Sequence, residues 1–343
     1  MDLTGVMDLT GGMELSSDEM TADAPTAPTF REGVSIWLWD DAGRFAFPRI
    51  GVEAVGATWE TAFGVALCMA LPDGRLLLVT EDGAPHPVSD GDGRPRVLGA
   101  GPLGFRCVEP FAHWRVEFDG DVASTDVDAY LSGGSPRITD EGETGRVPLK
   151  LEIDARMVTP PWVYGRHEPE GGGVAGEHRY EQLCTVTGTV QVGGYSTPFS
   201  GGGLRIHRKG GNRSDYGDFY GHNWQSARFP SGRAFGFIHY RPRPDGSVKY
   251  REGWLLDGGE LLPARVEGTP WMTETRPNGE DVSFTLNTAN GAFRIGGETF
   301  VSSFRPPRPI GDGTAFPLLQ SGIARYQWDD ETAFGMIERS ALL

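Results

Sequence analysis

The stretch that decides the fold is VPLKLEIDARM, residues 147–157. Apolar residues occupy every second position of this stretch, and most of the positions between them are polar or charged. Such a period of two is typical of a β-strand with one buried face, whereas a helix repeats its apolar residues every three or four positions. The stretch therefore predicts a half-buried strand.

Strand patterns of the same kind recur on both sides of this stretch, with turn residues between them. The chain holds 50 glycines and 25 prolines in 343 residues, which favours many turns and short strands. No amphipathic helix longer than three turns appears. We therefore expect an all-β, mostly antiparallel fold. Further predicted strands lie at 35–39, 44–47, 65–71, 75–79, 186–192, 235–240, 248–256, 282–286, 292–295 and 323–328.

An internal repeat indicates that one strand–turn–strand unit is used twice. Ala-Phe-Gly at 62–64 precedes Pro-Asp-Gly at 72–74, and the same two tripeptides occur at 234–236 and 244–246. All six identities share an offset of 172 residues, since 234 minus 62 is 172. Repeats of this kind favour two related β domains, although coincidence in a glycine-rich chain is the alternative.

The repeat sets the expected domain organisation. Residues 1–29 are predicted to be a disordered acidic tail, because they hold six acids and no base. An N-terminal β domain follows at 30–164, then a linker at 165–177 and a C-terminal β domain at 178–343. Two tandem antiparallel barrels or sandwiches would hide their sheet edges and provide a cavity in or between them.

Composition excludes several function classes. A net charge of −16 and a pI near 4.9 disfavour nucleic acid as a partner. No apolar run approaches the ~18–20 residues of a membrane span, and no signal-peptide pattern opens the chain. Three cysteines are too few for a disulfide scaffold, so we expect free thiols and a cytoplasmic location.

Chemically capable side chains concentrate between residues 204 and 254. In a strand through 219–225, Tyr220, His222 and Trp224 would share one face. A face made of phenol, imidazole and indole suits a pocket wall, because each polar tip needs a partner. The alternative is a core strand whose polar tips are satisfied by the backbone.

The neighbouring strands add further candidates. His239 and Tyr240 point to opposite faces, so at most one of them faces the same pocket. Tyr250, Glu252 and Trp254 share a face, where Glu252 is either a buried acid or a rim charge. A metal site built from His207, His222 and one acid (Asp215, Asp218 or Glu252) fits no standard spacing, so no metal is expected.

Glu338 lies on an otherwise apolar face of the last strand, with Phe334 and Met336. A carboxylate in that position is either paired with an arginine or kept protonated by burial.

Several short motifs resemble a known family. They are 203–224 with His222-Asn223-Trp224, the tripeptides at 234–236 and 244–246, Tyr180-Glu181-Gln182, and 335–340. Together they resemble the tandem lipocalin-like carotenoid hydratases (hydroxyneurosporene synthases), AttH-like proteins and related cyclases and Diels–Alderases, and most closely the uncharacterised bacterial members. The family pattern usually reads Asp-His-x-Trp, and Gly221 stands here in place of the acid. Asp218, Asp215 or Glu252 would then have to supply it.

The resemblance implies a lyase, isomerase or cyclase that needs no cofactor and acts on a hydrophobic isoprenoid, steroid or polyene. Acid–base chemistry is assigned to His222, Tyr220, Asp218 and Glu252, with Trp224 stabilising a developing cation. A carrier of hydrophobic small molecules and a pericyclase that folds its substrate remain the alternatives. Residues expected to contact the substrate are Trp224, His239, Tyr240, Tyr250, Trp254 and Glu338.

Overall fold

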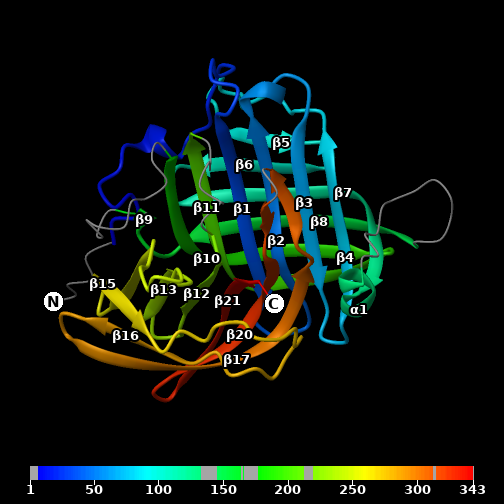
Figure 1. Ribbon diagram of the computed structural model, residues 1–343. Coiled ribbons are helices and arrows are strands. Elements are labelled where there is room, and N and C mark those ends of the chain that lie inside the picture. Colours follow the sequence, from blue (N-terminus) through cyan, green and yellow to red (C-terminus); the bar gives the residue numbers. More distant parts are fainter. Residues whose placement is uncertain are drawn as a thin grey trace.

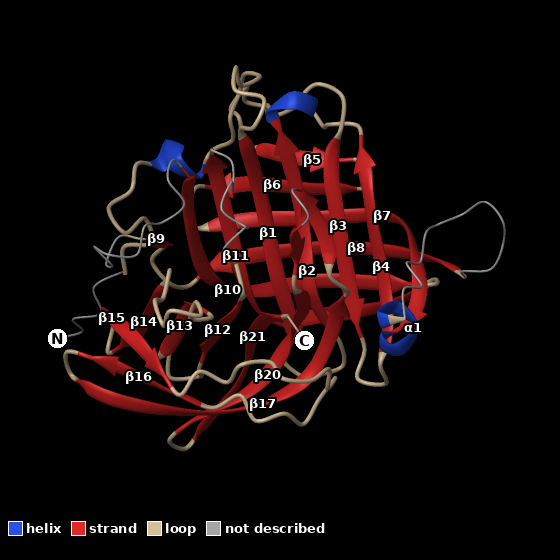
Figure 2. Ribbon diagram, in the orientation of Figure 1, coloured by secondary structure: helices blue, strands red, loops and turns tan. Residues whose placement is uncertain are grey.

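The computed structural model describes residues 7–132, 145–163, 165, 177–211, 219–311 and 314–342. The chain forms two closed, eight-stranded antiparallel β-barrels, and helices are limited to short turns (Figure 1, Figure 2). The all-β prediction is confirmed, with barrels rather than sandwiches. Within the described residues, no helix combines the length and the apolar character needed to cross a membrane.

The first barrel closes where β4 pairs with β7 and β1 pairs with β11. The quoted stretch falls in β8, where burial alternates as predicted. The barrel strands are β1 (Arg31–Asp40), β2 (Ala46–Val55), β3 (Phe63–Ala70), β4 (Arg75–Gly83), β7 (His113–Asp126), β8 (Arg146–Met157), β10 (Glu177–Val192) and β11 (Tyr195–Gly210). Beside them lie β5 (Val97–Ala100), β6 (Leu103–Glu109), β9 (Trp162–Val163), α1 (Val127–Leu131) and the 3-10 turns η1 (Leu15–Asp18) and η2 (Gly56–Thr58).

The second barrel closes where β12 pairs with β21. Its strands are β12 (Gly221–Arg228), β13 (Ala234–Tyr240), β14 (Arg251–Asp257), β15 (Glu260–Glu267), β16 (Phe284–Thr288), β17 (Gly291–Arg305), β20 (Leu318–Trp328) and β21 (Glu331–Ala341). A separate two-stranded sheet joins β18 (Arg308–Gly311) to β19 (Thr314–Phe316).

The repeated tripeptides mark corresponding pairs of strands. The first copy spans β3 and β4, the second spans β13 and β14, and each pair is antiparallel. Both copies of the repeat thus lie on an antiparallel pair of strands joined by a turn.

The boundary between the two barrels lies later in the chain than the sequence predicts. β10 and β11 follow the predicted linker at 165–177, yet both belong to the first barrel. The reason is edge closure, because without them β1 and β8 would each present an unpaired edge. The chain passes to the second barrel between Gly210 and Gly221.

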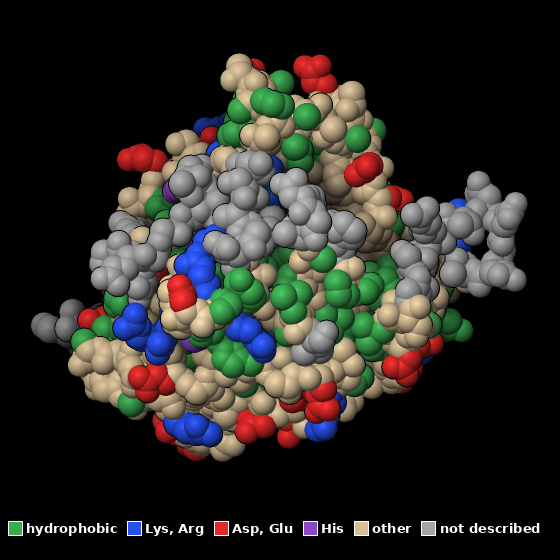
Figure 3. Space-filling view, in the orientation of Figure 1, with side chains coloured by type: hydrophobic (Ala, Val, Ile, Leu, Met, Phe, Trp, Pro, Cys, Tyr) green, Lys and Arg blue, Asp and Glu red, His purple; other side chains and the backbone are tan. Residues whose placement is uncertain are grey.

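The two barrels pack together along a seam with its own apolar layer. Trp37 of β1 meets Trp224 of β12 edge to face, with ring centres 4.9 Å apart. Each barrel also has an interior core of its own, built from inward-facing apolar side chains. On the face shown in Figure 3, hydrophobic side chains gather between the barrels with Lys and Arg beside them.

Residues 7–29, predicted as part of a disordered acidic tail, are partly buried, because Asp18 and Met20 are buried while Asp8, Glu14 and Asp23 are exposed. Asp18, in η1, is fully buried at one end of the first barrel. Its carboxylate accepts hydrogen bonds from Trp114 Nε1 at 3.0 Å and from Arg205 Nη1 at 2.7 Å. The charge count missed this because the partner cation lies 187 residues away in the sequence.

Candidate functional site between the barrels

The outer face of the second barrel turns a polar stripe toward the first barrel. Residues that pair directly across an antiparallel ladder share a face, so the register defines rows of neighbouring side chains. One row runs Ser303, Ser321, Glu338, Trp224, Ile238, Glu252. The next row runs Arg305, Leu319, Ser340, His222, Tyr240.

A buried histidine–carboxylate pair lies at the centre of this stripe. His222 Nε2 is 3.2 Å from Glu338 Oε1, and His222 Nδ1 is 2.6 Å from Ser340 Oγ. Ser321 Oγ donates to Glu338 Oε2 at 3.0 Å. His222 and Glu338 are only 7% and 8% exposed, so both hydrogen bonds are shielded from water. Four side chains from three strands thus form one continuous hydrogen-bonded chain.

The backbone explains why a glycine precedes His222. Gly221 has a φ of 127°, and a Cβ at this position would come within 2.2 Å of the carbonyl oxygen of Ser340. An aspartate therefore does not fit beside His222 in this backbone. The acid comes from Glu338 on the adjacent strand instead. The sequence singled out Glu338 as a substrate contact but did not identify it as the partner of His222.

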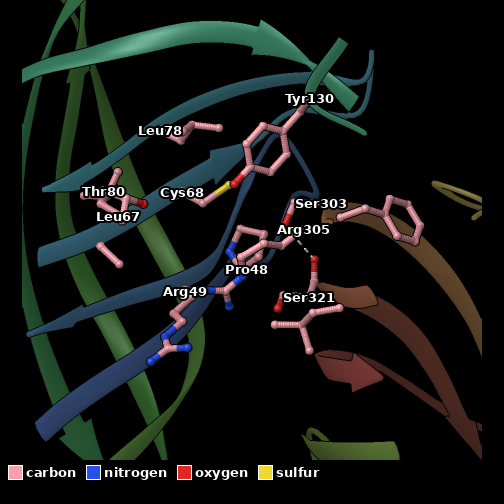
Figure 4. Close-up of a pocket in the computed structure, with 13 residues that line it drawn as sticks. Pro48, Arg49, Leu67, Cys68, Leu78, Thr80, Tyr130, Ser303, Arg305 and Ser321 are labelled. Carbon is pink, nitrogen blue, oxygen red and sulfur yellow. Dashed lines mark hydrogen bonds between the residues drawn. The ribbon is translucent and has the colours of Figure 1, made fainter. Parts of the chain in front are cut away.

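A small cavity adjoins the pair. Its volume is about 60 Å³, and Figure 4 shows Arg49 entering it from the first barrel and Ser303, Arg305 and Ser321 from the second. Ser303 Oγ donates to the carbonyl oxygen of Ser321 at 3.0 Å. Because Ser321 also binds Glu338, the hydrogen-bonded chain reaches the cavity wall.

Electrostatics keep Glu338 ionised. Burial alone would raise the pKa of this carboxyl, but the hydrogen bond and charge of His222, with Arg49 and Arg305 nearby, lower the pKa to about 2. Glu338 is therefore ionised at neutral pH and can accept a hydrogen bond from His222. Cys68 also lines the cavity, and burial raises the pKa of its thiol to about 12, which disfavours thiolate chemistry.

Aromatic rings surround the other side of His222. Phe219 lies 5.6 Å from the imidazole and 5.2 Å from Tyr240, and it stacks on Phe316 at 5.4 Å. Tyr240 in turn lies 5.7 Å from Tyr250. Tyr240 and Tyr250 thus lie on the aromatic side of His222, and their contact with a substrate stays a prediction.

Glu252 and Trp254 belong to the same seam but to another part of it. Glu252 is 3% exposed and accepts from Tyr250 and from the amide of Gly165 at 3.0 Å. Within the described part of the chain, its Oε1 has no hydrogen-bond partner. Trp254 donates to Glu181 of the first barrel at 3.3 Å. Glu252 is thus a buried acid, one of the two alternatives raised by the sequence.

Other candidates fall outside the site. His239 faces the interior of the second barrel beside Asn223, which corrects its grouping with Trp224. It bonds Thr269 at 2.7 Å, and burial with Arg251 and Arg265 lowers its pKa to about 4. Tyr220 precedes β12 and is half-buried, so its role stays a prediction. Asp215 and Asp218 lie outside the described residues.

The histidines considered for a metal site do not meet. His207 lies inside the first barrel, where Nε2 is 3.1 Å from Glu32 and Nδ1 is 3.7 Å from Asp18, so its two nitrogens face different carboxylates. His222 lies on the outer face of the second barrel. Over the part of the chain that the structure describes, no group of three or more His, Cys, Asp or Glu could hold a metal ion.

Sequence reasoning missed the arginines and serines of the cavity. Arg49 and Arg305 reach it from strands that no sequence motif links, and only the barrel packing unites them. Ser340 carried a signal, because it stands two positions after Glu338 and therefore on the same strand face.

Fold and site together define a class: tandem eight-stranded barrels with a histidine–glutamate pair buried in the seam. Residues 16–342 match the model of a family described as Domain of unknown function (DUF7064). The chain belongs to that family. Among curated proteins, no significant match to the chain is found.

Solved structures share the architecture at low sequence identity. A protein from Nitrosomonas europaea, whose assignment as AttH is provisional, matches with a TM-score of 0.62 at 14% identity, over 94% of this chain and 98% of that one. CghA, solved with Sch210972, matches with a TM-score of 0.55 at 11% identity, over 92% and 89%. Kievitone hydratase from Nectria haematococca gives 0.49 at 10% identity, over 95% and 94%. The first two likenesses support the fold.

Proposed function

We propose that the chain is an enzyme that moves protons on a hydrophobic substrate bound in the seam, as a lyase, isomerase or cyclase. The observation that carries the proposal is the buried hydrogen-bonded chain from Ser340 through His222 and Glu338 to Ser321 at the cavity wall. A histidine held by an ionised carboxylate is the usual arrangement for a group that takes and returns a proton near neutral pH.

Each member of the site has a distinct role in this proposal. His222 holds the proton, and Glu338 fixes the imidazole and balances the charge of its protonated form. Ser321 joins the pair to the cavity. Arg49 and Arg305 stabilise negative charge that develops on a substrate oxygen.

The size of the cavity restricts how the substrate binds. A volume of about 60 Å³ has room for about two water molecules, at ~30 Å³ each. It therefore accepts a reacting end and a water, while the apolar body lies along Phe219, Tyr240 and Phe316. CghA, which has the same fold, was solved with a small molecule, Sch210972, and this supports a ligand-binding role for the architecture.

The test begins with the ligand. Native mass spectrometry of freshly purified protein, followed by organic extraction, identifies any compound that co-purifies. That compound, or farnesol and geranylgeraniol if none is found, is then incubated with the protein in D2O. Mass spectrometry of the products reports hydration, isomerisation or deuterium uptake.

Matched variants separate the mechanisms. His222→Ala and Glu338→Gln are expected to lower turnover by about 10²–10⁴-fold while binding persists. His113→Ala is the control, because it removes a histidine paired with Asp154 at 2.7 Å on the outside of the first barrel. Binding by the wild type without any turnover or exchange would overturn the proposal in favour of a carrier. Full turnover in both variants would favour a pericyclase that only folds its substrate.

A further inference from the structure

A second groove lies along the same seam, away from His222. Its volume is about 400 Å³, and none of its lining residues lines the cavity beside Glu338. This volume is within the range of small-molecule sites, about 300–1,000 Å³. The groove is therefore a second candidate binding site, separate from the cavity beside Glu338.

Two arginines and a phenylalanine form the wall from the second barrel. Arg325 pairs with Phe334 across β20 and β21, and its guanidinium lies 5.5 Å from the centre of that ring. Arg228 ends the next strand, β12, and its buried Nε has no hydrogen-bond partner among the residues that the structure describes. Among the described residues, neither arginine forms an ion pair with a carboxylate. The wall thus combines an apolar ring with two cations.

The indole of Trp39 forms the main apolar surface of the wall from the first barrel. Trp39 of β1 pairs with Gly202 of β11, which pairs with Thr185 of β10. A Cβ at Gly202 would come within 2.6 Å of the Trp39 indole, so the ring lies directly over this glycine. The absence of a side chain at 202 leaves room for the Trp39 indole to pack against the backbone of β11.

We propose that this groove binds a small organic monoanion with a planar apolar body. Arg228 and Arg325 hold the anionic head, and the body packs between Trp39 and Phe334. Asp41 also lines the groove, so two arginines and one aspartate leave one net positive charge, which matches a single negative charge. The proposal is independent of the chemistry assigned to His222.

The test uses two fluorescent probes of similar shape and different charge. 8-Anilinonaphthalene-1-sulfonate carries one negative charge, and N-phenyl-1-naphthylamine carries none. Both are titrated into the full chain and into Arg228→Gln and Arg325→Gln. We expect each substitution to weaken binding of the sulfonate by about tenfold and to change binding of the neutral probe by less than twofold.

Controls exclude unfolding and general charge effects. Arg115→Gln removes an exposed arginine from the first barrel, outside the groove, and should leave both affinities unchanged. Unfolding midpoints of all variants are compared with the wild type, because partly unfolded protein also binds the sulfonate. Failure of the native protein to bind the sulfonate would overturn the proposal. Equal sulfonate affinity in the wild type and both groove variants would overturn it as well.

Discussion

Asp18→Ala should destabilise the first barrel strongly, although the residue stands in a segment that looks like a solvated tail. Arg205 is 1% exposed, and Asp18 is the carboxylate that pairs with it. Removing Asp18 leaves Arg205 with its hydrogen bond to Gln182, at 2.6 Å, but without a counter-charge. The substitution also removes the hydrogen-bond acceptor of the Trp114 indole N–H.

The size of the effect follows from the burial of the pair. Breaking a buried ion pair by removing one partner costs about 3–5 kcal/mol. The first barrel spans about 180 residues, from Arg31 to Gly210. At ~2.1 cal/mol/K of unfolding entropy per residue, that loss corresponds to a fall in Tm of about 8–13 °C.

The pH dependence has a definite sign. Burial opposes ionisation of Asp18, but Arg205, His207 and Tyr180 outweigh it and hold the pKa of the carboxyl well below its ordinary value of 3.8. A carboxyl with a lowered folded-state pKa contributes stability above its unfolded pKa and loses it as the pH falls toward the folded value. The gap between wild type and Asp18→Ala should therefore be full at pH 7 and shrink below about pH 4.

Thermal and urea unfolding at pH 7 and pH 3 measure this directly, with Trp fluorescence as the signal. Asp23→Ala is the matched control, because Asp23 is an exposed acid in the same segment and should cost less than about 0.5 kcal/mol. The double variant Asp18→Leu with Arg205→Met should regain most of the loss, since neither charge of this ion pair is then left buried without its partner. Equal stability of Asp18→Ala and Asp23→Ala would refute the reasoning.

Two further predictions concern the seam. Gly221→Ala should lower stability by about 1–3 kcal/mol in urea unfolding, because its φ of 127° and the 2.2 Å approach to Ser340 leave no room for a methyl group; a neutral effect would contradict the backbone described here. Trp224→Ala should cost about 3–5 kcal/mol, because this side chain is 2% exposed and packs on Trp37. A Trp224→Phe variant that recovers most of the loss would confirm that packing is the cause, whereas an unchanged Tm for Trp224→Ala would contradict it.

The sequence predicts strands and their repetition well because those depend on local patterns. The alternation over 147–157 predicts a strand with one buried face, and burial alternates along β8 as this pattern requires. The shared tripeptides report a turn and a following strand, and both copies form antiparallel pairs. The closure of each barrel depends on long-range ladders, such as β1 with β11, so the chain position of the barrel boundary could not be predicted locally.

The candidate site is harder to predict, because the pairing of strands brings together residues that are far apart in the sequence. His222 was identified from its strand, but its acid lies 116 residues later on a neighbouring strand. Arg49 comes from the other barrel and enters through packing alone. Asp18 shows the same limit, because a charge count cannot find a buried partner far along the chain.

Loss of alternation is itself a signal for the seam. Every residue of β1 after Arg31 is buried, and so are the first seven residues of β12, whereas β8 alternates between buried and exposed positions. A strand with both faces buried has the barrel core on one side and the partner barrel on the other. Buried polar side chains occur inside the barrels, as with Asp18 and His207, and also in the seam, as with His222 and Glu338. His222 lies on β12, which is one of these strands. Glu338 is buried on β21, which pairs with β12, and Glu252 is buried on β14, on the far side of β13. In related tandem barrels, polar residues on strands that lack alternation are therefore the first positions to test for function.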